Sequence, residues 1–293
     1  MNSKKKAWMQ DLRALPFLLP FFIAYLIFTI FPIFKGLEMS LYEWNLVRKL
    51  EFVGLENYTE MFQDEFFWDS LWNTTLFVIL TTPTMVALAL VLALLANLNT
   101  KLQTFFRGSF FLPSILSVAV ISFLAIFMLQ PYNGLVNTVL QLVGINAEPF
   151  WMADKTLAWV TIVVVTLWWT VGFNMVLFLA GLQDIPESLY EASEIDGATR
   201  WEQFRYITLP QLIPIGRVIL LLQILASYKV FAQILLITGG GPGGATRPLI
   251  QYIYEVGFTK NNLGYAATMS YALFFILLVL SIIQLRSQRS EGS

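Results

Sequence analysis

The sequence of 293 residues contains neither cysteine nor histidine. Without cysteine, the chain cannot form a disulfide and offers no thiolate to a metal or a substrate. Without histidine, it has no imidazole for zinc ligation or for acid–base catalysis near neutral pH. We therefore expect no catalytic residue and no metal site in this chain.

Charged residues are also scarce. They make up 13% of the sequence, and hydrophobic residues make up 57%, whereas a typical soluble domain has about 25% charged residues. The formal net charge of −1 provides no basic field, so we expect no nucleic-acid partner. The composition indicates a protein whose surroundings are the lipid bilayer.

Long uncharged runs give the positions of the expected membrane-spanning helices. A helix that crosses the hydrocarbon core needs about 20 mostly apolar residues. Six segments meet this requirement, at residues 14–34, 76–95, 109–129, 157–182, 218–237 and 265–285. We therefore expect an all-α membrane protein with one transmembrane domain over residues 14–285 and short tails at 1–13 and 286–293.

The lysine and arginine residues of the connecting segments indicate the orientation, because cytoplasmic loops carry an excess of them. The side of the N-terminus has Lys4, Lys5, Lys6, Arg13, Lys101, Arg107, Arg200, Arg205, Arg217, Arg286 and Arg289. The opposite side has only Lys35, Arg48, Lys49, Lys155, Arg247 and Lys260. The bias predicts that both termini and the segment 184–214 are cytoplasmic.

The outer segment 35–73 is rich in aromatic residues, namely Trp44, Tyr58, Phe62, Phe66, Phe67, Trp68 and Trp72. Such rings concentrate at the level of the lipid headgroups. This favours a helix lying in the membrane interface, and contact with an extracytoplasmic partner is the alternative.

The inner segment 184–214 predicts two short helices. Asp184 and Glu187 have the spacing of a capping box, and Pro186 falls in the first turn. We expect this helix to end near Ile195 or Asp196, before Gly197, because glycine readily takes the left-handed conformation after a helix.

Thr199 and Glu202 have the capping-box spacing of a second helix. Trp201, Phe204 and Thr208 lie on one face of it at helical spacing, and we expect Pro210 to end it. The two helices and the intervening glycine would form a rigid element on the cytoplasmic face.

The first of these helices is acidic although it lies on the cytoplasmic side, at Glu187, Glu191, Glu194 and Asp196. It also has small residues at Ala192, Ser193 and Ala198. A capped acidic helix with small side chains can enter a cleft on another protein, where a carboxylate meets a cation. An ordinary solvated hairpin is the alternative.

The inner segment contains Glu191-Ala192-Ser193-Glu194-Ile195-Asp196-Gly197-Ala198, followed by Trp201, Phe204 and Ile207-Thr208-Leu209-Pro210. This pattern resembles the EAA loop of ABC importer permeases, in particular those of the carbohydrate-uptake branch of the maltose and glycerol-3-phosphate type. Ser193 departs from the alanine usual at the third position.

Two further regions resemble the same family, so the similarity extends over most of the chain. The first is Phe52-Val53-Gly54-Leu55-Glu56-Asn57-Tyr58 with Asn73-Thr74. The second is Thr238-Gly239-Gly240-Gly241-Pro242 with Thr246, Tyr252-Ile253-Tyr254 and Gly264-Tyr265-Ala266-Ala267.

The resemblance implies the type I ABC importer permease fold with six transmembrane helices. In that family two homologous permease subunits form the pathway, two cytoplasmic ATPase subunits bind ATP and Mg and dock on the EAA loops, and an extracytoplasmic binding protein delivers the solute. The residues that would contact the ATPase are Glu191, Ala192, Ser193, Asp196, Gly197 and Ala198. Glu191 would be the anionic contact, and Gly197 would set the angle between the helices.

Lys229 is the only charged residue inside an expected span. A cation at mid-membrane costs at least about 2.5–3.5 kcal/mol, so it should face a cavity or a partner rather than lipid. Lys229 therefore either lines the pathway or a subunit interface, or serves as a structural tether.

Other polar or aromatic residues of the expected spans are also candidates for the substrate path: Asn174, Gln223 and Trp169. Amides beside aromatic rings suit an uncharged sugar, although the same amides commonly join helices to one another. Gly239, Gly240, Gly241 and Pro242 predict a tight outer turn that either only connects the spans or shapes the external opening.

Two other classes of membrane protein fit the sequence poorly. A membrane-embedded enzyme or an ion-coupled carrier usually needs Asp, Glu or His at membrane depth, and the expected spans contain none. The chain also lacks a phosphate-binding loop, so we expect ATP hydrolysis by separate subunits and no cofactor in this chain. A sugar is the expected cargo, with glycerol phosphate or a polyol as the alternative.

Overall fold

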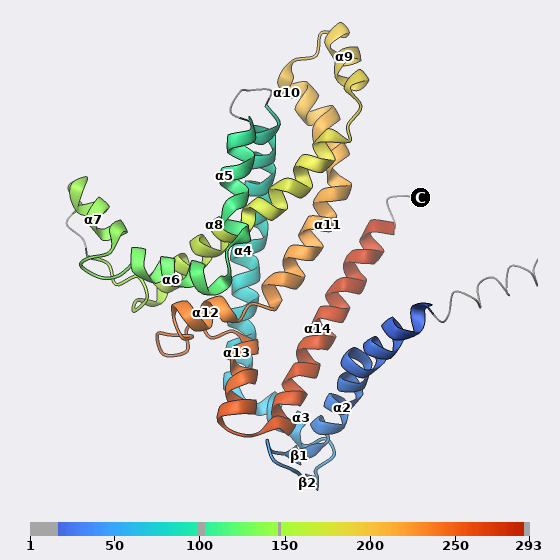
Figure 1. Ribbon diagram of the computed structural model, residues 1–293, viewed down its shortest axis with the longest axis vertical. Helices are drawn as coiled ribbons and strands as arrows, with labels where there is room; N and C mark the ends of the chain where they lie inside the picture. The colour runs from blue at the N-terminus through green and yellow to red at the C-terminus, as the bar shows by residue number, and fades with distance from the viewer. Residues whose placement is uncertain (1–16, 99–102, 146–147, 290–293) are drawn as a thin grey trace, which may run out of the picture. The chain divides into compact units, whose positions relative to one another are not determined.

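The computed structural model describes residues 17–98, 103–145 and 148–289, which are mostly helical (Figure 1). In this part of the chain, five helices are long and apolar enough to cross a membrane, and a bent helix pair makes six if it counts as one span. Their bounds are Phe17–Ser40, Glu65–Asn97, Lys155–Gln183, Arg200–Tyr228 and Leu263–Arg286, with Gln103–Ile115 and Val118–Met128 as the bent pair. The expected tails lie outside the described residues, except for the last helical residues before 290.

The chain forms two compact units. The first contains the residues up to Asp64 together with Ile253–Leu273, and the second contains Glu65–Tyr252 together with the residues from Phe274 onward.

The first unit begins with the helix Phe17–Ser40. Its elements are η1 (Leu26–Ile30), α2 (Phe31–Ser40), β1 (Tyr42–Trp44), β2 (Lys49–Phe52), α3 (Glu56–Gln63), η3 (Glu255–Thr259) and the first part of α14 (Leu263–Arg289). The buried Asn57 amide donates to the carbonyls of Ser40 at 3.0 Å and Tyr42 at 3.1 Å, and the Tyr265 hydroxyl donates to Asp64 at 2.7 Å. The Asn57 bonds hold α3 against the end of α2 and the start of β1, and the Tyr265 bond holds α14 to the end of α3.

The strands β1 and β2 form an antiparallel hairpin that the sequence analysis did not predict. The Asn45 side chain accepts hydrogen bonds from the backbone N–H groups of Val47 and Arg48 and so closes the turn. The Lys49 ammonium lies 3.4 Å from the centre of the Tyr42 ring, and its hydrogen bond to Glu38 raises the pKa of Lys49. The expectation of an all-α protein is therefore wrong in this detail, and the position of the segment at the headgroup level stays a prediction.

The second unit contains the longest helices. Its elements are α4 (Glu65–Asn97), α5 (Gln103–Ile115), α6 (Val118–Met128), α7 (Leu135–Leu142), α8 (Lys155–Gln183), α9 (Glu187–Ile195), α10 (Arg200–Gln203), η2 (Phe204–Thr208), α11 (Leu209–Tyr228), α12 (Ala232–Ile237), most of α13 (Leu249–Tyr254) and the end of α14. Helices α4, α8 and α11 share a buried apolar core. On α4, Ala89, Ala93 and Ala96 are fully buried, and small side chains of this kind allow close helix packing.

The expected third span is sharply bent. Helix α5 ends at Ile115, α6 begins at Val118, and their axes differ by 100°. The bend leaves backbone N–H and C=O groups without partners in the helix, and two side chains bond to such groups. The Ser117 hydroxyl accepts from the N–H of Val120, and the Trp169 indole of α8 donates to the carbonyl of Leu116 at 3.1 Å. Side chains of α8 thus stabilise a break that hydropathy alone does not reveal.

The region of the expected fifth span, residues 218–237, also differs in the structure from the single helix predicted. Its helix is continuous from Arg200 and stops at Tyr228, and Lys229 to Phe231 separate it from the short helix α12. Residues 218–237 are therefore two helices joined by a break, and Lys229 lies in the break rather than inside a helix.

Pro210 does not end the preceding helix, contrary to our expectation. The chain takes one wide π turn over Phe204–Thr208 and continues as α11. A proline ring clashes with the carbonyl four residues earlier in an α-helix, and the wider π turn gives that carbonyl room. The same arrangement occurs in the first helix, where the π turn Leu26–Ile30 precedes Pro32.

Candidate functional site

The predicted cytoplasmic segment forms a helical hairpin, here named the α9–α10 element (residues 187–208). Figure 1 shows α9 and α10 at one end of α8 and α11, away from α12. Helix α9 covers Glu187–Ile195 and ends at Asp196. Gly197 follows with φ +78°, a left-handed conformation that glycine adopts without steric cost. The predicted end of this helix is confirmed.

The two predicted capping boxes have different outcomes. The box of Thr199 and Glu202 is confirmed, because the N–H of Glu202 donates to Thr199 and the N–H of Thr199 donates to Glu202. The prediction of a capping box formed by Asp184 and Glu187 is wrong. Helix α8 continues to Gln183, so Asp184 ends that helix instead, and Pro186 precedes α9 without a side-chain cap.

Helix α9 has one face toward the rest of the α9–α10 element. Tyr190 and Ser193 are half-buried there. The Tyr190 hydroxyl lies 2.9 Å from the Thr208 hydroxyl, and the Gln203 amide donates to Ser193 at 3.0 Å. Ser193 is one of the candidate residues expected from the sequence, whereas Tyr190, Gln203 and Thr208 are not, since no local motif reveals pairs that form across a turn.

The opposite face of α9 is open. Glu191, Ala192 and Asp196 are exposed, and Ile195 exposes 88% of its surface. Ala198 is half-buried beside the turn. The element therefore presents an apolar residue between carboxylates, which is the arrangement expected of a helix that enters a cleft on a partner.

The second candidate site is a cavity of about 550 Å³ in the second unit. It lies beside the breaks of both interrupted spans, because Val118 of α6 and Val230 of the α11–α12 break line it. Five aromatic side chains form much of its wall: Phe77, Phe111, Trp169, Phe173 and Phe231. Pockets for small molecules commonly have this volume and this apolar character.

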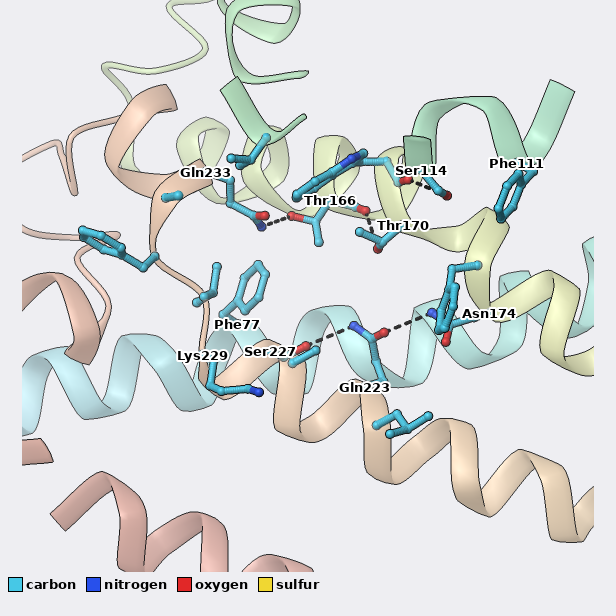
Figure 2. Close-up of a pocket in the computed structure, with 18 residues that line it drawn as sticks. Phe77, Phe111, Ser114, Thr166, Thr170, Asn174, Gln223, Ser227, Lys229 and Gln233 are labelled. Atoms are coloured by element: carbon cyan, nitrogen blue, oxygen red, sulfur yellow. Dashed lines mark hydrogen bonds between the residues drawn. The ribbon is translucent and has the colours of Figure 1, made fainter. Parts of the chain in front are cut away.

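The polar groups of the cavity lie in two rows (Figure 2). In one row, Asn174 donates to Gln223 at 3.1 Å, and Gln223 donates to Ser227 at 3.1 Å. In the other row, Gln233 donates to Thr166 at 2.7 Å. The structure thus brings Asn174, Gln223 and Trp169 to one cavity, and the two amides join α8 to α11 at its edge.

Among the described residues that line this cavity, Lys229 is the only charged one. It directly follows the last residue of α11, and Figure 2 shows its side chain beside Ser227. The described residues that line the cavity include no carboxylate.

The glycine-rich segment after α12 is a compact, hydrogen-bonded turn. Gly239 and Gly240 have φ values of +62° and +84°, which require glycine or strain another residue. The Thr246 hydroxyl donates to the carbonyl of Gly241 at 2.7 Å, and the buried Gln251 donates to that of Gly239 at 2.9 Å. Pro242 follows within the same turn. These residues do not line the cavity described above.

Metal-binding groups are not clustered in the described residues. In the part of the chain that the structure describes, no three side chains of Asp or Glu lie where they could hold one ion together.

A mostly helical chain with several helices long and apolar enough to cross a membrane, a cavity beside two helix breaks and an exposed helical hairpin has the features of a membrane transport subunit. Residues 85–290 match the family of binding-protein-dependent transport system inner membrane components. The chain belongs to this family.

Relatives that are similar along nearly their whole length support the assignment. The probable ABC transporter permease protein YurN of Bacillus subtilis (strain 168) is 35% identical over 92% of this chain and 94% of that protein. The lactose transport system permease protein LacF of Rhizobium radiobacter is 35% identical over 90% of each chain.

A solved structure has the same fold. It is a bacterial ABC transporter involved in the import of the acidic polysaccharide alginate, and one of its chains superposes with a TM-score of 0.88 at 25% identity, over 99% of each chain.

Proposed function

We propose that this chain is a permease subunit of an ATP-driven importer, that its α9–α10 element docks on a cytoplasmic ATPase subunit, and that its cavity is part of the pathway for a sugar. A second homologous permease completes the pathway, and an extracytoplasmic binding protein delivers the sugar. Two ATPase subunits bind ATP and Mg, so this chain is not an enzyme. Both termini and the α9–α10 element are cytoplasmic in this proposal.

One observation carries the proposal: a single helix joins the docking element to the cavity. The helical residues from Arg200 to Tyr228 are uninterrupted, a length of about 40 Å at 1.5 Å per residue. The far end of this helix contributes Gln223 and Ser227 to the cavity wall. A displacement of the α9–α10 element by an ATPase would therefore move the wall of the cavity directly.

The cargo is inferred from the cavity and from the relatives. Aromatic rings and amides together suit the apolar faces and hydroxyls of a sugar. The relatives include a lactose permease and the arabinooligosaccharides transport system permease protein AraP of Bacillus subtilis (strain 168), which is 33% identical over 99% of this chain. Glycerol phosphate or a polyol is the alternative cargo.

A charge reversal on the exposed face of α9 tests the docking. We expect Glu191→Arg to lower uptake roughly tenfold or more and to abolish co-purification of the ATPase, because a cation would replace the anion that faces the partner. Ile195→Asp should have the same effect, since it places a charge where an apolar side chain is expected to be buried on docking.

The control for this test is Glu60→Arg, which reverses an exposed charge on α3. We expect it to leave membrane insertion and ATPase co-purification unchanged. Normal co-purification of both Glu191→Arg and Ile195→Asp would show that this face of α9 is not the docking surface.

A further inference from the structure

We propose that Tyr190, Ser193, Gln203 and Thr208 form an interhelical lock that makes α9 move as one body with α11. The proposal rests on the proposed docking of the α9–α10 element and assigns these four side chains a positioning role in it. Tyr190 and Ser193 lie on the half-buried face of α9, so Ser193, which the family resemblance places among the ATPase contacts, has an internal role in this proposal. The four side chains act inside the element, by transmitting a displacement of α9 to the helix that reaches the cavity.

The backbone alone cannot supply this rigidity. Helix α9 has nine residues, and a helix this short is marginally stable in water by itself. It is connected through Gly197, the residue type with the greatest conformational freedom, to α10, which is the first turn of the uninterrupted helix Arg200–Tyr228. A glycine hinge between a short helix and a long one would absorb a displacement unless side chains fix the angle between them.

Two side-chain contacts connect α9 to the helix that follows Gly197, at two different positions along that helix. Gln203, at the end of α10, donates to Ser193 at 3.0 Å, and Ser193 in turn donates to the carbonyl of Tyr190 at 2.7 Å. Five residues further along, the Thr208 hydroxyl lies 2.9 Å from the Tyr190 hydroxyl. Two separate contacts fix the angle between α9 and the helix that begins with α10, whereas a single contact would let α9 rotate about it.

The second contact ties α9 to the membrane-spanning helix itself. Thr208 is buried, with 6% of its surface exposed, and it is the last residue of the π turn before α11. The π turn lets Pro210 follow without a break, so α11 continues directly from the residue that Tyr190 contacts. The lock therefore connects the docking face to the cavity through contacts that are all present in one chain.

Removal of the lock should separate docking from transport. In the assembled transporter, with its ATPase subunits and second permease, we expect the double variant Tyr190→Phe/Gln203→Leu to keep ATPase co-purification and to lower uptake about fivefold or more, since each lost hydrogen bond corresponds to roughly a fivefold change in an equilibrium. Thr208→Ser keeps the hydroxyl and should retain uptake. Gln211→Leu, an exposed glutamine of α11, is the matched control.

A distance measurement detects the lock itself. The chain has no cysteine, so spin labels can be placed at Ser188→Cys on α9 and Ile213→Cys on α11 without removing native residues. We expect a narrow distribution of label distances in the otherwise native chain, a clearly broader one in Tyr190→Phe/Gln203→Leu, and a narrow one in Gln211→Leu.

The outcomes separate this proposal from the one on which it rests. If the native chain binds no ATPase, the proposed function fails. If the native chain binds the ATPase and transports, and the double variant keeps both native uptake and the narrow distance distribution, the lock is overturned while the docking stands. Loss of uptake with an unchanged distance distribution would also overturn the lock.

Discussion

At the residue scale, Lys229 is the side chain whose position the structure changes most. The sequence predicted Lys229 inside the fifth membrane-spanning helix. In the structure it instead lies directly after the end of α11. A helix C-terminus favours a nearby cation by about 0.3–1 kcal/mol, which offsets part of the cost of a charge at membrane depth. The salt bridges of the described residues join Lys35 and Lys49 to Glu38 and do not involve Lys229.

Replacement of Lys229 tests its role. We expect Lys229→Ala to lower uptake or the yield of assembled transporter about tenfold, because it removes the only cation of the cavity lining, and Lys229→Arg to retain most of both. Lys155→Ala, at the exposed start of α8, is the control for loss of a lysine. Native uptake and native assembly of Lys229→Ala would show that the lysine has no important function in the pathway.

Local residue patterns predicted some features of the site and not others. The end of α9 before Gly197 and the capping box of Thr199 and Glu202 could be predicted, because each depends on residues only a few positions apart. The contact between Tyr190 and Thr208 could not, since it depends on how the chain turns between them. Asp184 was assigned to the wrong helix because a cap pattern does not show where the preceding helix ends.

At the element scale, hydropathy predicted where the chain is apolar but not where its helices break. The break at Leu116 and Ser117 has no proline or glycine at the bend itself, and Pro113 lies within α5. The Trp169 indole of α8 donates to the carbonyl of Leu116 at the bend, and the Ser114 hydroxyl of α5 donates to the backbone carbonyl of Trp169. Irregular backbone at membrane depth is tolerated only where protein groups or a water-filled cavity satisfy it, and those groups come from distant parts of the sequence.

The packing of α5 on α8 gives a test at this scale. A Cβ atom at Gly172 would lie 2.2 Å from the carbonyl oxygen of Phe110, a distance that only a backbone shift can relieve. Overpacking of this kind costs about 1–3 kcal/mol. We therefore expect Gly172→Ala to lower the thermal unfolding temperature of the purified protein by about 3–10 °C and to lower uptake, since both helices line the cavity.

Gly108→Ala is the matched control, because it makes the same substitution in α5 with no atom within 4 Å of the new Cβ. Alanine is the better helix former, so the unfolding temperature should stay the same or rise. Equal unfolding temperatures for Gly172→Ala and the native protein would mean that the two helices do not pack as closely as the structure shows.

At the scale of the whole molecule, the family could be inferred from short motifs, whereas the arrangement of the pathway could not. The segment from Glu191 to Ala198 pointed to the family because its motif lies within eight consecutive residues. The cavity is formed by side chains from α4, α5, α6, α8 and α11 and by the residues that follow α11. Its lining depends on two breaks that the sequence analysis did not predict, so only some of its residues were found beforehand.

The orientation in the membrane is the remaining feature of the whole molecule that depends on charge bias alone, and it can be tested directly. Val47 and Ile195 expose 89% and 88% of their surfaces, and no native cysteine interferes with labelling. With both termini cytoplasmic, Val47→Cys should react with a membrane-impermeant maleimide in intact cells, and Ile195→Cys only after permeabilisation. Co-expression of the ATPase subunits should then protect Ile195→Cys but not Val47→Cys, because docking would bury the α9 face. The reverse labelling pattern would show that the predicted orientation is wrong. The α9–α10 element would then lie outside the cell, where no cytoplasmic ATPase could reach it.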